Sequence, residues 1–178
     1  MEGTQKSTMQ FIREHRNFVQ EKLLKIVREL FNRAEDHDKS KLKEPELSGW
    51  LAMDKEPRYK YGTPEYFDKR ERYKWVFEEH YKHNRHHPEY WKGFFNEMDL
   101  IDFLEMIIDW CSYKENISMD EMIQIVTENC ERFNFPPLMK DLAINTLKNY
   151  ITSEPDIWEE IGIEKPSLKD VNWNDWNC

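Results

Sequence analysis

The sequence predicts an all-α, single-domain helical bundle, and three observations support that fold class. Apolar side chains recur at steps of three and four residues, helix-start signals precede several of these runs, and no segment alternates apolar and polar residues as a strand would. A chain of 178 residues is long enough to bury one sizeable core. We expect one domain over residues 1–165 and a tail at 166–178, which docks onto that domain through Trp173 and Trp176.

The first half of the chain carries three helix patterns. Ser7 and Gln10 match a capping box, and an apolar stripe from Ile12 to Leu30 follows them and includes His15. Proline opens the second pattern, and a Thr-Pro pair opens the third, as expected at the N-cap and first position of a helix. The expected helices are 8–34, 45–55 and 63–85, with a polar break at 36–41 and a short aromatic turn at 88–91.

The second half continues in the same way. An almost entirely apolar segment, a Ser-x-x-Glu capping box at Ser118 and Glu121, and a Pro-Pro pair each begin a helix pattern. The expected helices are 99–113, 118–133, 136–151 and a short one at 155–161.

Composition excludes several classes of protein. The formal net charge of −9 argues against a general DNA- or RNA-binding protein, because phosphate contacts need dense Lys and Arg. No apolar run approaches the length of a membrane span, and the N-terminus lacks a signal-peptide core. The three cysteines show no CxxC spacing, and no GxGxxG or P-loop motif is present. We expect a cytoplasmic protein that does not bind membranes.

Charge and histidine are distributed unevenly. Residues 1–92 carry a net charge of +3, residues 93–178 carry −12, and all six histidines lie at or before His87. The basic half suits a small anionic substrate such as a nucleotide.

Three segments hold polar residues with metal-binding chemistry. His37 and Asp38 are adjacent, and an imidazole and a carboxylate can bind one ion together. The dipeptide alone is a weak signal, and a surface turn is the alternative. Residues 79–89 contain four histidines, and on a helix His80, His83, Asn84 and His87 share a face. The alternative for this segment is a cluster of surface histidines.

The third segment is residues 100–111, which is apolar almost all round and is therefore expected to be buried. Asp102, Glu105 and Asp109 lie on one side of it, and buried carboxylates are costly unless they are paired or bind metal. Solvated surface charges are the alternative. A helical bundle can bring His15, the His-Asp pair, the later histidines and Asp109 to one point in its core.

The order of these residues along the chain, which is His15, the His-Asp pair, the later histidines and Asp109, resembles that in the HD-domain superfamily of metal-dependent phosphohydrolases. Members of that superfamily are all-helical. The motifs HDKSK (37–41), HYKHNRHHPEYW (80–91) and EMIIDW (105–110) resemble more closely a bacterial and phage family defined only as a domain of unknown function. The resemblance covers about residues 10–115. Lys41 departs from the nucleotidase branch, which has Glu at that position, and the histidines at 80–87 are bunched more tightly than in typical two-metal members.

The resemblance implies a metal-dependent phosphohydrolase that acts on a small phosphorylated substrate, in the first place a nucleotide. One or two divalent ions (Mn, Fe, Co, Mg or Zn) would be bound by His15, His37, Asp38, His80, His87 and Asp109. Glu105 would act as acid/base or orient a ligand, and His86 would reach the substrate or a second ion. Lys41, Lys82, Asn84 and Arg85 would hold the substrate. The alternatives are a di-iron oxygenase of HD-like fold and a non-catalytic phage protein that binds a nucleotide or a partner.

Overall fold

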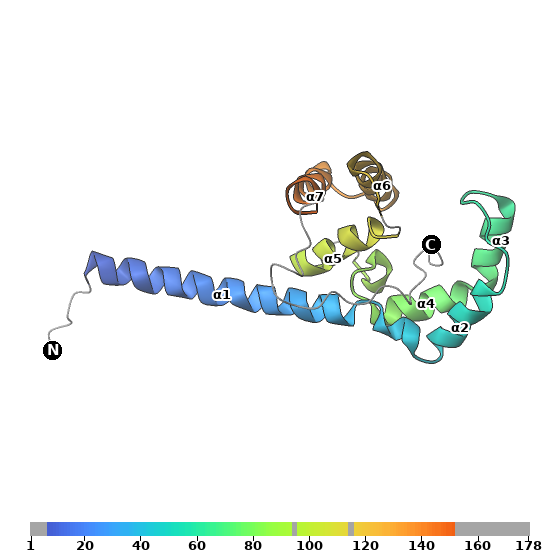
Figure 1. Ribbon diagram of the computed structural model, residues 1–178, viewed down its shortest axis with the longest axis horizontal. Coiled ribbons are helices and arrows are strands. Elements are labelled where there is room, and N and C mark those ends of the chain that lie inside the picture. Colours follow the sequence, from blue (N-terminus) through green and yellow to red (C-terminus); the bar gives the residue numbers. More distant parts are fainter. Residues whose placement is uncertain (1–6, 94–95, 114–115, 152–178) are drawn as a thin grey trace. The chain divides into compact units, whose positions relative to one another are not determined.

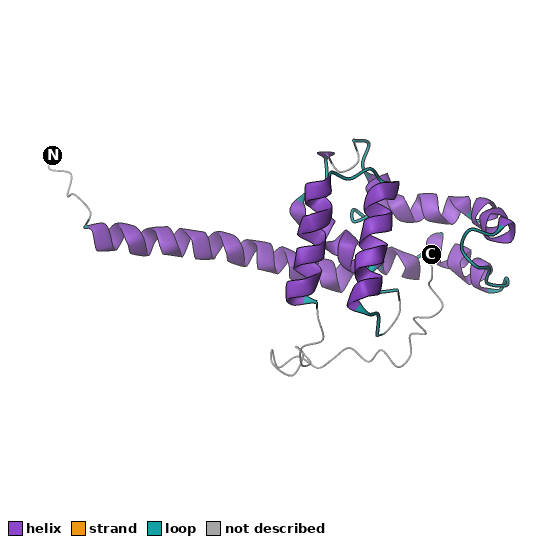
Figure 2. Cartoon of the chain, turned by 90° about the horizontal axis from the view of Figure 1, so that it is seen from above, coloured by secondary structure: helices purple, strands orange, loops and turns teal. Residues whose placement is uncertain are grey.

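The computed structural model describes residues 7–93, 96–113 and 116–151. Within these ranges the ordered elements are seven α-helices and two short 3-10 helices, with no strand, which confirms the all-α prediction (Figure 2). The predicted helix at 155–161 and the tail at 166–178 lie outside the described residues. The elements are α1 (Thr8–Asp36), η1 (Lys39–Leu42), α2 (Glu46–Asp54), α3 (Pro64–Arg72), α4 (Lys74–His83), η2 (Pro88–Tyr90), α5 (Leu100–Trp110), α6 (Met119–Arg132) and α7 (Pro137–Tyr150).

The chain divides into two compact units, residues 1–39 and residues 40–178. The described part of the first unit is α1, a single uninterrupted helix (blue in Figure 1). Its start is as predicted, because the Ser7 hydroxyl accepts a hydrogen bond from the backbone N–H of Gln10. It ends at His37, whose backbone N–H donates to the carbonyl of Arg33. No residue of α1 is buried.

The second unit contains two apolar clusters. The larger cluster lies among α5, α6 and α7 (Figure 1). Met106, Val126 and Leu147 are fully buried in it. The smaller one joins α2 to α4 through Trp50, Val76 and Phe77. Among the described residues, none of the helices is long and apolar enough to cross a bilayer.

One predicted helix is two helices in the structure. The pattern at 63–85 predicted continuous helix, but α3 ends before Tyr73 and α4 begins after it. The phenol oxygen of Tyr73 is tied to α2 and the loop after it, 3.2 Å from the carbonyl oxygen of Ala52 and 2.9 Å from Glu56 Oε1. These contacts accompany non-helical dihedral angles at Tyr73, and Asn84 then ends α4 in an extended conformation.

Two helices in the second half of the chain, α5 and α6, each begin with a capping box. The one at Ser118 and Glu121 was predicted and is confirmed. The one at Asp99 and Asp102 was not predicted, and it uses Asp102 to accept from the backbone N–H of Asp99. Asp102 is therefore part of the scaffold at the start of α5, and it is fully buried.

Candidate metal centre

His80, on α4, is held by a buried carboxylate from α2. Its Nδ1 lies 2.6 Å from Oε1 of Glu46, and both residues are only 2% exposed. The same oxygen accepts a hydrogen bond of 2.9 Å from the indole N–H of Trp50. Burial alone would raise the pKa of the Glu46 carboxyl, but hydrogen bonds from His80, Trp50 and Ser40 outweigh burial and keep that pKa below its usual value. Glu46 therefore stays a carboxylate and orients the imidazole of His80.

His86 is held in the same manner from α5. Its Nδ1 lies 3.1 Å from Oε1 of Glu105, and both side chains are largely buried. The other ring nitrogen, Nε2, is also buried. A carboxylate beside Nδ1 keeps the proton of a neutral imidazole on that nitrogen, which puts the lone pair on Nε2. Metal-binding histidines are typically oriented by a carboxylate or carbonyl in this way.

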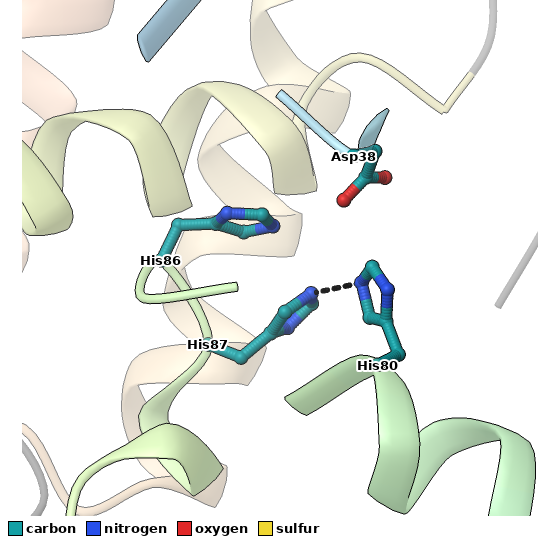
Figure 3. Close-up of side chains that lie close together, drawn as sticks. All are labelled: Asp38, His80, His86 and His87. Carbon is teal, nitrogen blue, oxygen red and sulfur yellow. Dashed lines mark hydrogen bonds between the residues drawn. The ribbon is translucent and has the colours of Figure 1, made fainter. Parts of the chain in front are cut away.

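The rings of His80, His86 and His87 converge on one another (Figure 3). Each offers a ring nitrogen, and these three nitrogens lie within 4.8 Å of one another. The Nε2 atoms of His80 and His87 are 2.9 Å apart. Two lone pairs repel at that distance, so this contact needs either a proton or a cation between the nitrogens.

A carboxylate adjoins this cluster within the same unit. Asp109, on α5, offers a ligand oxygen within 4.8 Å of the ligand nitrogen of His86. Imidazole nitrogen together with carboxylate oxygen is a common ligand set for divalent transition metals. The chain thus contains His and Asp side chains that could hold a metal ion.

The predicted His37–Asp38 pair lies at the end of the first unit. Nε2 of His37 is 3.6 Å from Oδ2 of Asp38. Asp38 has a φ of 54°, in the left-handed region, where Asp is one of the few tolerated side chains. The second unit begins two residues later at Ser40, whose hydroxyl accepts a 2.7 Å hydrogen bond from Asn84 Nδ2 and lies 3.5 Å from Nδ1 of His80.

His15 lies far from this pair. Both belong to the first unit, and 22 positions along α1 separate His15 from His37. At 1.5 Å per residue the separation is about 33 Å. The side chain of His15 is exposed, so α1 does not bring it together with His37 and Asp38.

Two of the residues predicted to bind substrate are held within the scaffold. Asn84 is buried, and its amide donates to Ser40 and to the backbone carbonyl of His80. Arg85 forms two hydrogen bonds of 3.0 and 2.9 Å with Asp102, and its guanidinium lies 4.7 Å from the ring centre of Trp91. These contacts explain how both residues fix the chain between α4 and α5, and their role toward a substrate stays a prediction.

The two predicted lysines each have a partner within the chain. The ammonium of Lys41 lies 5.1 Å from the ring centre of Trp50, and that of Lys82 is 2.7 Å from Glu79. Glu79 also contacts His83, at 3.1 Å from its Nε2. His83 points to solvent and lies outside the histidine cluster, because α4 ends there and the chain turns His87 back toward His80.

Glu46 was missed by the sequence reasoning. It stands in the first turn of a short helix after Pro45, where an acidic residue ordinarily complements the helix dipole at the surface. The signal that could have found it is its spacing, since Gly49 and Trp50 follow at steps of three and four and share its face. All three of these residues are buried.

No curated protein and no solved structure matches the chain. The model of one family, described as a family of unknown function (DUF5662), matches residues 4–153. That range contains the HDKSK, HYKHNRHHPEYW and EMIIDW motifs, and the match confirms the resemblance to a family of unknown function; kinship with the HD-domain superfamily stays a prediction. The chain belongs to the DUF5662 family.

Proposed function

We propose that this protein is a metal-dependent phosphohydrolase that acts on a small phosphorylated substrate. The observation that carries the proposal is the pair of buried carboxylate–histidine contacts, Glu46–His80 and Glu105–His86, which orient two imidazoles toward His87. Scaffolding alone does not require two buried carboxylates on two histidines of one cluster. A nitrogen-rich ligand set favours Fe, Co or Zn over Mg or Mn.

The ligands proposed within the second unit are His80, His86, His87 and Asp109. His37 and Asp38 stay predicted ligands because of the resemblance to HD-domain enzymes. The left-handed backbone at Asp38 supports a functional role as well, since such conformations gather at active sites.

The metal would supply a bound water of lowered pKa and neutralise charge on a phosphoryl oxygen. The chain's own residues would orient the metal ligands and exchange protons. Glu46 and Glu105 keep the protons of His80 and His86 on Nδ1, and Glu105, whose side chain is 11% exposed, would also exchange a proton with a substrate. His86 and Asp109 would bind a second ion where two are used.

A pocket next to the histidines supports a nucleotide as the substrate. It has a volume of about 770 Å³, within the usual size of small-molecule sites, and lies among α3, α4 and η2. Tyr81 belongs to its wall, and the Tyr81 ring centre is 5.0 Å from that of His87. Phe67 and Tyr90 offer further aromatic surface for a base. The charged side chains of the wall are mixed, three basic (Arg70, Lys74, Lys82) and four acidic (Asp68, Glu71, Glu78, Glu89), so this pocket supplies no net positive charge for phosphate.

Elemental analysis followed by turnover assays tests the proposal. The purified protein is analysed for metals, stripped with a chelator, and reloaded with Mn, Co, Fe, Zn or Mg before assay on nucleotides and simple phosphoesters. We expect stoichiometric metal and release of phosphate, both lost in His80→Ala and both retained in the control His83→Ala.

Three results would overturn the proposal. Redox-active iron that consumes oxygen without phosphate release indicates the oxygenase. Nucleotide that binds and is recovered unchanged indicates a non-catalytic binder. Absence of metal after reloading removes the metal centre itself.

A further inference from the structure

α1 carries apolar side chains of which none is buried. The helix has 29 residues, none of them buried. Its exposed apolar side chains include Ile12, Val19, Leu23 and Ile26, which are 43–59% exposed. Most of the stability of a protein helix comes from packing of its apolar face, and contiguous exposed apolar surface marks an interaction site.

The spacing of these residues identifies the kind of partner. Ile12, Val19 and Ile26 are seven residues apart, and a second series seven residues apart contains Arg16, Leu23 and Leu30. Interleaved at steps of three and four, the two series form the a and d positions of a coiled coil. A seven-residue repeat is matched by another helix with the same repeat, and α1 itself supplies one.

Arg16 determines the direction of pairing. In a parallel pair of identical helices Arg16 would face its own copy in the seam, and like charges there repel. In an antiparallel pair centred on residue 21, Ile12 faces Leu30 of the second copy and Val19 faces Leu23. Arg16 then faces Ile26, and its aliphatic stem can cover that side chain while the guanidinium reaches water.

The side chains that flank the seam can be accommodated in this arrangement. His15 and Glu29 of the second copy meet along one edge of the seam. Lys22 meets its own copy at the centre of that edge, where water screens the repulsion and Glu21 of the same helix lies 3.9 Å from the ammonium. We propose that two copies of this chain associate through an antiparallel pairing of α1, centred on residue 21. This proposal does not depend on the metal centre.

The mass of the full-length protein in solution tests the proposal. We expect light scattering and sedimentation to give a dimer that dissociates on dilution. Val19→Asp places a charge in both of the symmetry-related contacts between Val19 of one copy and Leu23 of the other. It should raise the dissociation constant of the dimer by about 100-fold. The matched control is Phe18→Asp, because Phe18 is also exposed but lies outside the seam, and this variant should remain a dimer. Circular dichroism of both variants checks that helix content is retained.

Spin labels distinguish the two directions. One spin label is attached to Thr8→Cys in a chain that also carries Cys178→Ser. In the antiparallel pair this label lies across from residue 34 of the second copy. The two labels of the dimer are then about 39 Å apart along the helix axis. In a parallel pair the two labels would sit at the same level, about one helix diameter apart. A protein that is monomeric at all concentrations overturns the proposal. That result would mean that another part of the chain, such as residues 152–178, covers α1. A dimer that survives Val19→Asp, or a short distance between labels, overturns it equally.

Discussion

Glu46→Gln is the sharpest test of the histidine cluster. The change keeps the size of the side chain and an oxygen that can accept from Trp50 and His80, but it removes the negative charge from the buried contact at 2.6 Å. Without that charge the imidazole of His80 is less basic and its proton is less firmly held on Nδ1. Loss of such a supporting carboxylate typically weakens metal binding by about 10–100-fold, which corresponds to about 1.4–2.7 kcal/mol.

The folded chain should be affected less than the metal. Both hydrogen bonds to Glu46 can persist with the amide oxygen, so we expect the apo protein to lose about 1 kcal/mol of unfolding free energy. The assay is a competition titration of apo protein with Zn or Co against a chromophoric chelator, alongside urea unfolding. Nitrogen-15 NMR of the imidazole shows directly whether Nδ1 of His80 carries the proton in the parent protein.

Glu79→Gln is the matched control. Glu79 also contacts a histidine, His83, on the same helix, but this pair is at the surface and outside the cluster. Its substitution should leave metal affinity unchanged. If Glu46→Gln binds metal as tightly as Glu79→Gln does, Glu46 serves only to satisfy buried hydrogen bonds, and the argument for a carboxylate-supported metal ligand fails.

Three further predictions concern the scaffold. Arg85→Ala leaves the fully buried Asp102 without its guanidinium partner and should cost about 3 kcal/mol in unfolding free energy, measured by urea denaturation; an unchanged midpoint would contradict this. Leu147→Ala in the core of α5, α6 and α7 should cost about 2–5 kcal/mol, whereas Leu142→Ala on the 48% exposed side of α7 should change stability little; equal effects would show that this core is wrongly assigned. Burial raises the pKa of the Cys130 thiol above its ordinary value of 9.0, so the folded protein favours the neutral thiol. This contribution to the free energy of unfolding is complete below pH 9.0 and is lost as the pH rises through the higher pKa of Cys130 in the folded protein. The free energy of unfolding of Cys130→Ala should therefore fall less steeply at alkaline pH.

The sequence predicted most helices well because their ends carry local chemistry. The caps at Ser7, Thr63 and Ser118 are formed by the residues expected to form them, and these interactions need no knowledge of distant contacts. The break at Tyr73 escaped prediction because its cause is tertiary. The phenol of Tyr73 reaches Glu56, and no local pattern in residues 63–85 announces that contact.

The residues of the candidate site also divide into those that the local sequence reveals and those that depend on distant contacts. Histidine is rare enough and chemically specific enough that four of them in eleven residues drew attention to 79–89, and three of these converge in the structure. Spacing on an ideal helix also grouped His83 with them, which the end of α4 prevents. Glu46 could not be separated by sequence from the chain's many surface acids, since its burial depends on how α2 packs against α4.

Ser40 links the HDKSK motif to the histidine cluster within the second unit. Its hydroxyl accepts a 2.7 Å hydrogen bond from Asn84 Nδ2 and lies 3.5 Å from Nδ1 of His80. Asn84 is buried and also donates to the backbone carbonyl of His80. A buried amide must have its hydrogen bonds satisfied, so the serine of HDKSK and the asparagine of HYKHNRHHPEYW depend on each other although 44 positions separate them.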